Sequence, residues 1–154
     1  GRVYVSWTDN RNGEDDNDVW LVYSDDQGRS WTEPVRVNDD PPGAQQFFPW
    51  MDVDDVTGNV HIVFYDRRAS FAKHQNLNLR STWDTEVYVA SSYDGGDTWE
   101  NLRVSEEKFR TNPKGFFGDY NNISAYDGIV RPIWTRNDDG VLSIWTAILD
   151  GYVE

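Results

Sequence analysis

The sequence predicts an all-β protein made of four-stranded antiparallel sheets, arranged as the blades of a β-propeller that is incomplete in this chain at about two and a half blades. Three observations predict it. Short β-branched and aromatic runs recur along the 154 residues, clusters of Gly, Asn and Asp separate them, and one eight-residue pattern occurs twice. No stretch shows the periodicity of an amphipathic helix.

Ten runs predict strands in order along the chain. Two hairpin turns are explicit, because Gly58 and the pair Asp127-Gly128 accept the positive φ that tight turns need. Regular short strands of this kind are typical of sandwiches, barrels and propellers. The predicted strands are residues 2–7, 18–24, 34–37, 49–53, 59–65, 85–91, 101–104, 121–126, 129–135 and 141–148.

Internal repeats distinguish among these architectures. Residues 24–31 (SDDQGRSW) and 92–99 (SYDGGDTW) share the pattern S-x-D-x-G-x-[ST]-W, and the strands on either side of the two copies also match. Residues 7–11, 64–68 and 134–138 align as well. The chain therefore consists of four-stranded units, A to D, and contains B-C-D, A-B-C-D and A-B-C, at approximately residues 1–40, 46–106 and 116–154. A radial array of such sheets is a propeller.

The length does not suffice for a closed ring. At about 60 residues per unit, six blades need on the order of 350 residues. The chain also opens directly in a strand without an initiating Met. We therefore expect a piece of a longer propeller, or one part of a propeller that a partner chain completes.

Composition excludes several classes of function. The net charge of −13 argues against nucleic acid and anionic membranes as partners, and favours an extracellular or cation-binding protein. Aromatic residues form 15% of the chain, which argues against disorder. The absence of Cys excludes disulfides and thiolate metal sites, and no apolar run approaches the roughly 20 residues of a membrane span.

The repeated turn has a mechanical explanation. Its Ser and Asp side chains can bond backbone N–H groups within the hairpin, and its Gly adopts conformations that a side chain would hinder. Its Trp can cover the turn and bury apolar area between neighbouring sheets. The sequence thus assigns structural roles to Ser24, Asp26, Gly28, Trp31, Ser92, Asp94, Gly96 and Trp99.

The turn resembles the Asp-box, or BNR repeat, of sialidase-like β-propellers, and both copies match that pattern at every defining position. Residues 46–50, 63–68 and 116–120 also resemble secreted bacterial proteins described as exo-α-sialidases or BNR-repeat glycosyl hydrolases. The resemblance implies the C-terminal part of a secreted or cell-surface bacterial propeller. It also implies that the Asp-boxes are structural and lie away from the substrate.

The same resemblance implies a type of chemistry. Sialidases use an arginine cluster for the sialate carboxylate, a Tyr nucleophile paired with a Glu, and an Asp acid/base, without a required cofactor. No Glu here lies in an evident Tyr-partner context, so the complete set is not visible. Arginines at strand ends are Arg11, Arg68, Arg131 and Arg136, and the catalytic candidates are Asp66, Arg68, Asp119, Tyr120 and Arg131.

Each catalytic candidate has a structural alternative. Asp66 can cap its loop and pair with a neighbouring Arg, Asp119 and Tyr120 can belong to a turn, and Arg131 can form an ion pair. Six aromatic residues could stack on sugars, but their positions within strands favour the core. These six are Trp7, Trp20, Tyr65, Tyr88, Trp134 and Trp145.

An acidic loop at residues 9–18 is a possible Ca²⁺ site, because that ion takes six to eight oxygen ligands. The spacing differs from the EF-hand pattern, so a solvated acidic loop is the alternative. The candidate ligands are Asp9, Asn12, Glu14 and Asp16.

Three functional hypotheses follow. The first is a sialidase-like glycoside hydrolase acting on terminal sugars of glycoconjugates, with a glycan or glycoprotein surface as its partner. The second is a non-catalytic propeller that binds carbohydrate or protein at a cell surface. The third is a structural piece completed by the remaining blades or by a partner chain.

Overall fold

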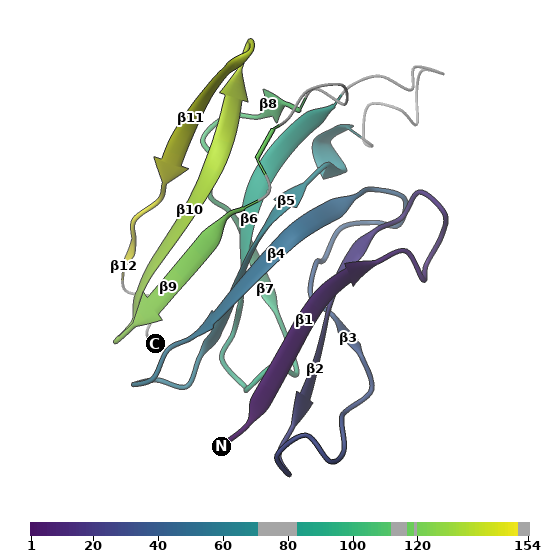
Figure 1. Ribbon diagram of the computed structural model, residues 1–154, viewed down its shortest axis with the longest axis vertical. Coiled ribbons are helices and arrows are strands. Elements are labelled where there is room, and N and C mark those ends of the chain that lie inside the picture. The colour runs from purple at the N-terminus through teal and green to yellow at the C-terminus, as the bar shows by residue number, and fades with distance from the viewer. Residues whose placement is uncertain (71–82, 112–116, 119, 151–154) are drawn as a thin grey trace.

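A computed structural model describes residues 1–70, 83–111, 117–118 and 120–150 (Figure 1). Its strands form three antiparallel sheets, which confirms the predicted all-β fold and an incomplete propeller. We call the sheets the first, middle and third blades. Within the described ranges, no helix is long and apolar enough to cross a membrane.

The first blade contains β1 (Val3–Asp9), β2 (Asp18–Ser24) and β3 (Val35–Arg36) in that order. These are the expected strands B, C and D. β1 and β2 pair along their whole length, from Val3 opposite Ser24 to Asp9 opposite Asp18.

The middle blade is a complete unit with order β4-β5-β6-β7. Its strands are β4 (Gln46–Val53), β5 (Val60–Asp66), β6 (Asp84–Ser92) and β7 (Glu100–Arg103). A bulge interrupts β4 between Phe47 and Trp50, where Phe48 has a φ of 53°. The short β8 (Phe109–Arg110) pairs with the start of β6 and was not predicted from the sequence.

The third blade contains β9 (Asn122–Tyr126), β10 (Ile129–Asp138), β11 (Val141–Thr146) and β12 (Leu149–Asp150). β10 pairs with all three others. The pairs Ile133–Thr146 and Val130–Leu149 keep one register, so β12 continues β11 as the third strand of the unit.

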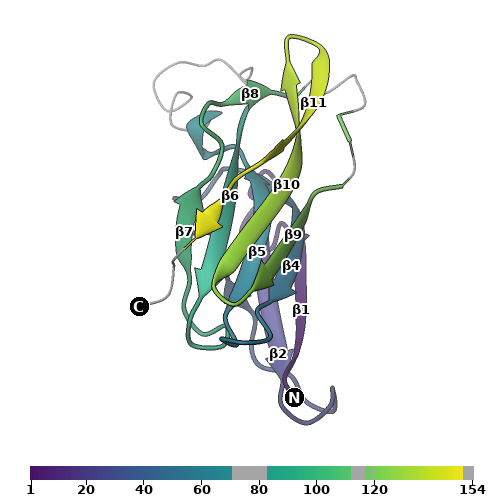
Figure 2. The ribbon, with the colours of Figure 1, turned by 90° about the vertical axis from the view of Figure 1, so that its left-hand side faces the viewer.

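The three blades lie face to face, with the middle one between the other two (Figure 2). All seven residues of β5 are buried because neighbours cover both of its faces. Ile62 and Phe64 pack in the core shared with the first blade, whereas Val63 and Tyr65 pack in the core shared with the third. The two-residue period of a strand thus divides β5 between two cores.

Polar contacts also join the middle blade to the third. Asp54 accepts N–H bonds from Val56 and Thr57 in its own turn, and from Asp127 and Gly128 in the turn of the third blade. Burial opposes ionisation of Asp54, but these four donors hold its pKa well below its usual range. The β4–β5 and β9–β10 turns therefore lie together at one edge of the molecule.

The opposite edge is where β1, β5 and β10 end and where β2, β4, β6, β9 and β11 begin. It lies at the top of Figure 1. We call it the site edge, because loops there carry most of the candidate residues. We call the edge with the β4–β5 turn and the repeated turns the box edge.

Candidate functional site

Asp66 and Arg68 lie together at the site edge and neutralise one another. The fully buried Asp66 carboxylate accepts bonds from the Arg68 backbone N–H at 2.7 Å and from its Nε at 2.9 Å. A second Arg68 nitrogen donates to Asp39 at 2.6 Å, and the guanidinium lies 4.0 Å from the centroid of the Tyr88 ring. Burial raises the pKa of Asp66, and the bonds from Arg68 oppose that shift.

The arrangement around Arg68 occurs three times, once in each blade. Arg11 pairs with Asp9 and lies over Trp20 at 4.5 Å, and Arg136 pairs with Asp138 and lies over Trp145 at 4.5 Å. Trp20, Tyr88 and Trp145 occupy equivalent positions opposite the aligned residues Trp7, Phe64 and Trp134. This repetition supports a structural role for the Asp66–Arg68 pair, the alternative that the sequence left open.

Arg67, between these two residues in the sequence, has a different environment. Its guanidinium donates to the Gln45 side chain at 2.7 Å and to the Thr111 hydroxyl at 2.9 Å. It lies 4.8 Å from the Phe47 ring centroid and 4.6 Å from that of Trp83.

No carboxylate among the described residues forms an ion pair with Arg67, and its Nε is buried without a partner there. Burial lowers its pKa to about 10, so the side chain stays charged at neutral pH. Among the described residues, Arg67 thus has no carboxylate partner and lies close to two aromatic rings, which suits an anionic ligand.

Sequence reasoning chose Arg68 and missed Arg67. Strand alternation was the available signal, because it places consecutive residues at a strand end on opposite faces. Asp66 then faces the first blade, where Asp39 and Asp40 lie, and Arg67 faces the aromatic cluster shared with the third blade.

Sequence reasoning also missed a buried polar network beside the Asp66–Arg68 ion pair. The Asn38 amide nitrogen donates to Asp18 and Asp40, each at 2.6 Å, and Gln46 donates to Asp40 at 3.0 Å. Arg36 donates to Asp18 at 2.6 Å. These contacts attach residues 37–45 to the starts of β2 and β4.

The internal repeat carried a signal for this network. Asn38 Oδ1 accepts the Val19 N–H at 2.8 Å, and Ser105 Oγ accepts the Val87 N–H at 3.0 Å. Both acceptors lie two residues after the fourth strand of a unit, so a polar residue there binds the third strand.

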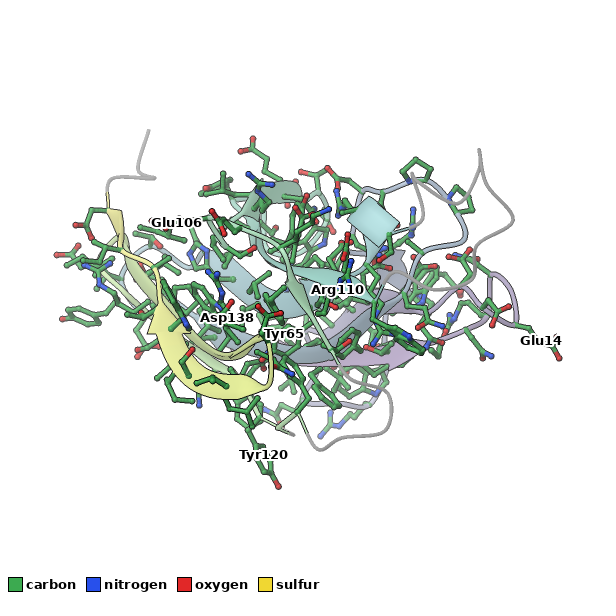
Figure 3. All side chains as sticks on the ribbon, turned by 90° about the horizontal axis from the view of Figure 1, so that it is seen from above. Glu14, Tyr65, Glu106, Arg110, Tyr120 and Asp138 are labelled. Carbon is green, nitrogen blue, oxygen red and sulfur yellow. The ribbon has the colours of Figure 1, made fainter. Side chains whose placement is uncertain are left out.

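Tyr120 lies at the site edge and is 77% exposed (Figure 3). The next residue, Asn121, donates to the Phe48 carbonyl at 2.8 Å and so attaches this segment to the β4 bulge. Asp119 lies outside the described residues. Phe48 and Trp50 on β4 are 39% and 43% exposed, so β4 has an accessible aromatic surface.

Arg131 does not join Asp66, Arg68 and Tyr120. It pairs with Asp150 at 2.6 Å and donates to the carbonyls of Val130 and Leu149, near the start of β10. That start adjoins the turn of the box edge, whereas Asp66 ends β5 at the site edge. These contacts match the structural alternative for Arg131, in which its side chain forms an ion pair.

Three of the four proposed calcium ligands have separate partners, and the fourth, Glu14, is exposed. The Asp9 carboxylate accepts from Arg11 and from the Trp7 indole, the Asn12 amide donates to Asp18, and Asp16 accepts the Gly43 N–H. The Arg11 bonds lower the pKa of Asp9 to about 2. Within the described part of the chain, no group of three or more His, Asp or Glu side chains is placed to hold a metal ion.

Both repeated turns have the same hydrogen bonds at the box edge. Ser24 Oγ donates to Asp26 at 2.8 Å and accepts the Gly28 N–H at 2.8 Å. Asp26 accepts the Ser30 N–H at 2.8 Å and its hydroxyl at 2.6 Å. In the second turn, Ser92 Oγ donates to Asp94 at 2.8 Å and accepts the Gly96 N–H at 2.7 Å. Asp94 accepts the Thr98 N–H at 2.9 Å and the Thr98 hydroxyl at 2.5 Å.

The two Trp residues of the turns differ. Trp99 packs against the core between the first and middle blades, as the sequence predicts. Trp31 is 43% exposed, so its predicted burial between sheets is wrong. The reason is that the first blade has a neighbour on only one face within the described residues.

Three of the six in-strand aromatic residues are buried, and Tyr88 is partly buried against the core between the first and middle blades. Trp20, Tyr65 and Trp134 are at most 9% exposed, whereas Trp145 is 36% exposed. Tyr65 exchanges bonds with the backbone of Thr135 and stacks on Phe47, and burial raises its pKa to about 12. Tyr65 therefore helps to hold the middle and third blades together.

Comparison with solved structures identifies the architecture. A Hadza microbial sialidase matches with a TM-score of 0.59 at 15% identity, over 94% of this chain and 32% of that protein. A Dyadobacter fermentans protein of unknown function matches at 0.57 and 20% identity, over 97% and 35%. A family 117 glycoside hydrolase from Zobellia galactanivorans matches at 0.56 and 16%, over 98% and 49%.

This chain thus spans about a third to a half of the length of these structural neighbours. No protein-family model and no curated protein matches its sequence. At these identities, the likeness shows a fold shared with propeller-type glycoside hydrolases.

Proposed function

We propose that this chain is part of a secreted, glycan-directed β-propeller of the sialidase-like glycoside hydrolase type, acting on terminal sugars of glycoconjugates. The observation that carries the proposal is the uncompensated guanidinium of Arg67 at the site edge. The names of the sialidase and of the glycoside hydrolase among the structural neighbours support it.

Electrostatics explains why an acidic sugar suits this position. A partly buried cation without a counter-ion loses hydration, and that loss is repaid when a carboxylate forms charge-assisted bonds with it. The rings of Phe47 and Trp83, which lie close to the guanidinium, offer apolar surface to a sugar. Arg67 therefore binds the acidic group, and Tyr120 and Trp50 contact the sugar rings.

The hydrolytic step needs a proton donor and a nucleophile or base at the anomeric carbon. Two buried carboxylates, at the end of β5 and in the segment before β4, are engaged, because Asp66 pairs with Arg68 and Asp40 binds Asn38 and Gln46. In this proposal the chain supplies substrate binding, and Asp119 with Tyr120 remains its catalytic candidate.

The second candidate function is a non-catalytic propeller that binds acidic glycans at a cell surface. The mutual neutralisation of Asp66 and Arg68 favours it, because that pair is then purely structural. Arg67 binds the acidic sugar in both candidate functions, so a measurement of catalytic turnover distinguishes the hydrolase from the non-catalytic propeller.

The test is a comparison of Arg67→Ala with Arg110→Ala in the intact protein. Arg110 is an exposed arginine whose ion pair with Asp84 lies at the same edge, which makes it a matched control. Affinity for a sialylated oligosaccharide should fall about 10- to 100-fold in Arg67→Ala, the loss expected for one charge-assisted bond, and stay unchanged in the control.

Binding of the neutral, desialylated oligosaccharide should be weak in all three proteins. Release of a fluorogenic aglycone from a sialoside by the intact protein supports the hydrolase, and binding without release supports the second candidate. Equal binding of sialylated and neutral glycans, or no binding of either, would refute both.

A further inference from the structure

The short strand β8 is an addition to the middle blade at the site edge. It lies in the connection after β7 and pairs with the start of β6 through Phe109 and Arg110. The equivalent connection after β3, residues 37–45, contains no strand. The contacts of the residue that follows β8 indicate what this addition does.

Thr111 follows β8 directly and contacts both parts of the Arg67 site. Its hydroxyl accepts a hydrogen bond from Arg67 Nη2 at 2.9 Å, and its backbone N–H donates to the Trp83 carbonyl at 3.2 Å. The ring of Trp83 in turn lies 4.6 Å from the guanidinium. Because Thr111 is buried, little solvent competes for these bonds. One residue therefore holds the cation and the backbone that carries the neighbouring ring.

Further contacts restrict the same two groups. The Thr85 hydroxyl donates to the Trp83 carbonyl at 3.1 Å and lies 3.4 Å from the Thr111 hydroxyl. The Gln45 side chain accepts from Arg67 Nη1 at 2.7 Å, and the Gln45 carbonyl accepts the Arg67 backbone N–H at 3.0 Å. Both terminal nitrogens of the guanidinium are thus held by neutral acceptors, which orient a cation without cancelling its charge.

The internal repeat links this arginine to β8. The residues aligned with Arg67 are Asn10 and Asn137, so the first blade has neither the arginine nor the added strand. The Arg67 Nε is also buried without a partner in the described part of the chain, an arrangement that lowers stability. A cation kept at this cost, with an added strand to orient it, is typical of a preorganised binding site.

We propose that Thr111 is a positioning residue, through which β8 holds Arg67 and Trp83 in one orientation and so gives the site its preference for acidic over neutral sugars. This inference rests on the proposed function. A cation that is already oriented loses less side-chain freedom when its ligand binds, so the complex is tighter. Thr111 acts through Arg67 and need not contact the ligand itself.

The first experiment compares Thr111→Val, Thr111→Ser and the control Ser105→Ala in the intact protein. Val keeps the shape of Thr and its backbone bond but lacks the hydroxyl, whereas Ser keeps the hydroxyl. Ser105 lies in the same connection and is buried, and its hydroxyl accepts the Val87 N–H, so the control loses a buried hydrogen bond that does not involve Arg67. Urea unfolding shows whether each variant keeps its fold.

Affinity for the sialylated oligosaccharide should fall about 3- to 10-fold in Thr111→Val, the loss expected for one hydrogen bond. It should stay within about twofold of wild type in Thr111→Ser and in Ser105→Ala. Binding of the neutral oligosaccharide should not change in any of the three. An equal loss in Ser105→Ala, or no rescue by Thr111→Ser, would overturn the proposal.

A double-mutant cycle separates positioning from a general structural effect. If Thr111 acts through Arg67, then Thr111→Val should lower the affinity no further in a protein that already carries Arg67→Ala. The same fold-loss with and without the arginine would show that Thr111 acts independently of it, and would also overturn the proposal.

A measurement without ligand distinguishes failure of this inference from failure of the proposed function. Exchange of the Arg67 Nε–H with solvent, followed by ¹⁵N NMR, should be roughly 3-fold faster or more in Thr111→Val and unchanged in Thr111→Ser. An unchanged rate in Thr111→Val would overturn the positioning role even where the glycan binds. A wild type that binds no sialylated glycan refutes the proposed function, and the exchange rates then still decide whether Thr111 orients Arg67.

Discussion

At the scale of single residues, the environment separates side chains that look alike in the sequence. Arg67 and Arg68 are consecutive arginines directly after β5. Arg68 has Asp66 and Asp39 as partners, and Arg67 has an amide, a hydroxyl and two rings. Within the described part of the chain, the Arg67 environment contains no carboxylate partner, so its positive charge is available to a ligand.

Tyr65 gives a prediction at this scale. Its hydroxyl bonds to Thr135 across two blades, so Tyr65→Phe should lower the free energy of unfolding at pH 7 by about 1 kcal/mol. Its pKa is raised to about 12 in the fold, from an ordinary value near 10. The raised pKa means that the wild type loses stability as pH rises from about 10 through about 12.

Tyr65→Phe lacks that titration, so the stability difference between the two proteins should shrink across this pH window. Urea unfolding at pH 7, 9 and 11 measures it. A difference that stays constant from pH 7 to 11 would contradict the assignment of the raised pKa to Tyr65.

Sequence reasoning succeeded at this scale where interactions are local, and failed where they are not. The bonds of Asp26 and Asp94 lie within four residues, so the pattern predicts them. Arg68 has a partner in Asp39, 29 residues away in another blade, and no pattern within residues 64–68 indicates that contact. The exposure of Trp31 also depends on whether another sheet covers the first blade.

At the scale of elements, the repeated turns combine a local bond network with a packing role. Gly28 has a φ of +84°, and a Cβ there would have only a van der Waals contact with Trp31, at 3.6 Å. Gly96 has a φ of +104°, and its Cβ would approach Leu21 of the first blade to 3.1 Å. The second turn therefore belongs to the contact between blades, and the first turn does not.

Gly28→Ala and Gly96→Ala form a matched pair. Each should lose about 1–2 kcal/mol through backbone strain at positive φ, and Gly96→Ala should lose more because Leu21 must also move. Thermal or urea unfolding of both variants measures the difference. Equal losses would show that the close approach to Leu21 is relieved without cost.

The strand order could largely be predicted because turn residues mark the boundaries and the repeat sets the number of strands per unit. β8 was missed because two residues carry no periodicity, and Phe109 and Arg110 form it by pairing with β6. The bulge at Phe48 was also missed, since its positive φ arises within an otherwise regular strand sequence.

At the scale of the whole molecule, the middle blade holds the other two. β5 contributes alternate residues to both cores, and Asp54 adds a polar connection to the third blade. Loss of the Asp54 carboxylate should therefore affect a blade to which it does not belong.

Asp54→Ala should lower the free energy of unfolding by about 1–3 kcal/mol and accelerate hydrogen exchange at the Asp127 and Gly128 amides. Because the pKa of Asp54 is depressed in the fold, its contribution is present above about pH 4 and is lost as pH falls further. The stability difference from wild type should thus shrink in acid. Exchange by NMR is the measurement, and unchanged rates at both amides would contradict the connection.

The Asp–Arg pair over an aromatic ring has one further consequence. In the first and middle blades the acid precedes the base, at Asp9 and Arg11 and at Asp66 and Arg68, but in the third blade Arg136 precedes Asp138. The two charges have exchanged places along the backbone while the guanidinium keeps its ring. A carboxylate on either side of the arginine along the chain can therefore hold the guanidinium over its ring, so the three blades share this geometry without sharing the residue order.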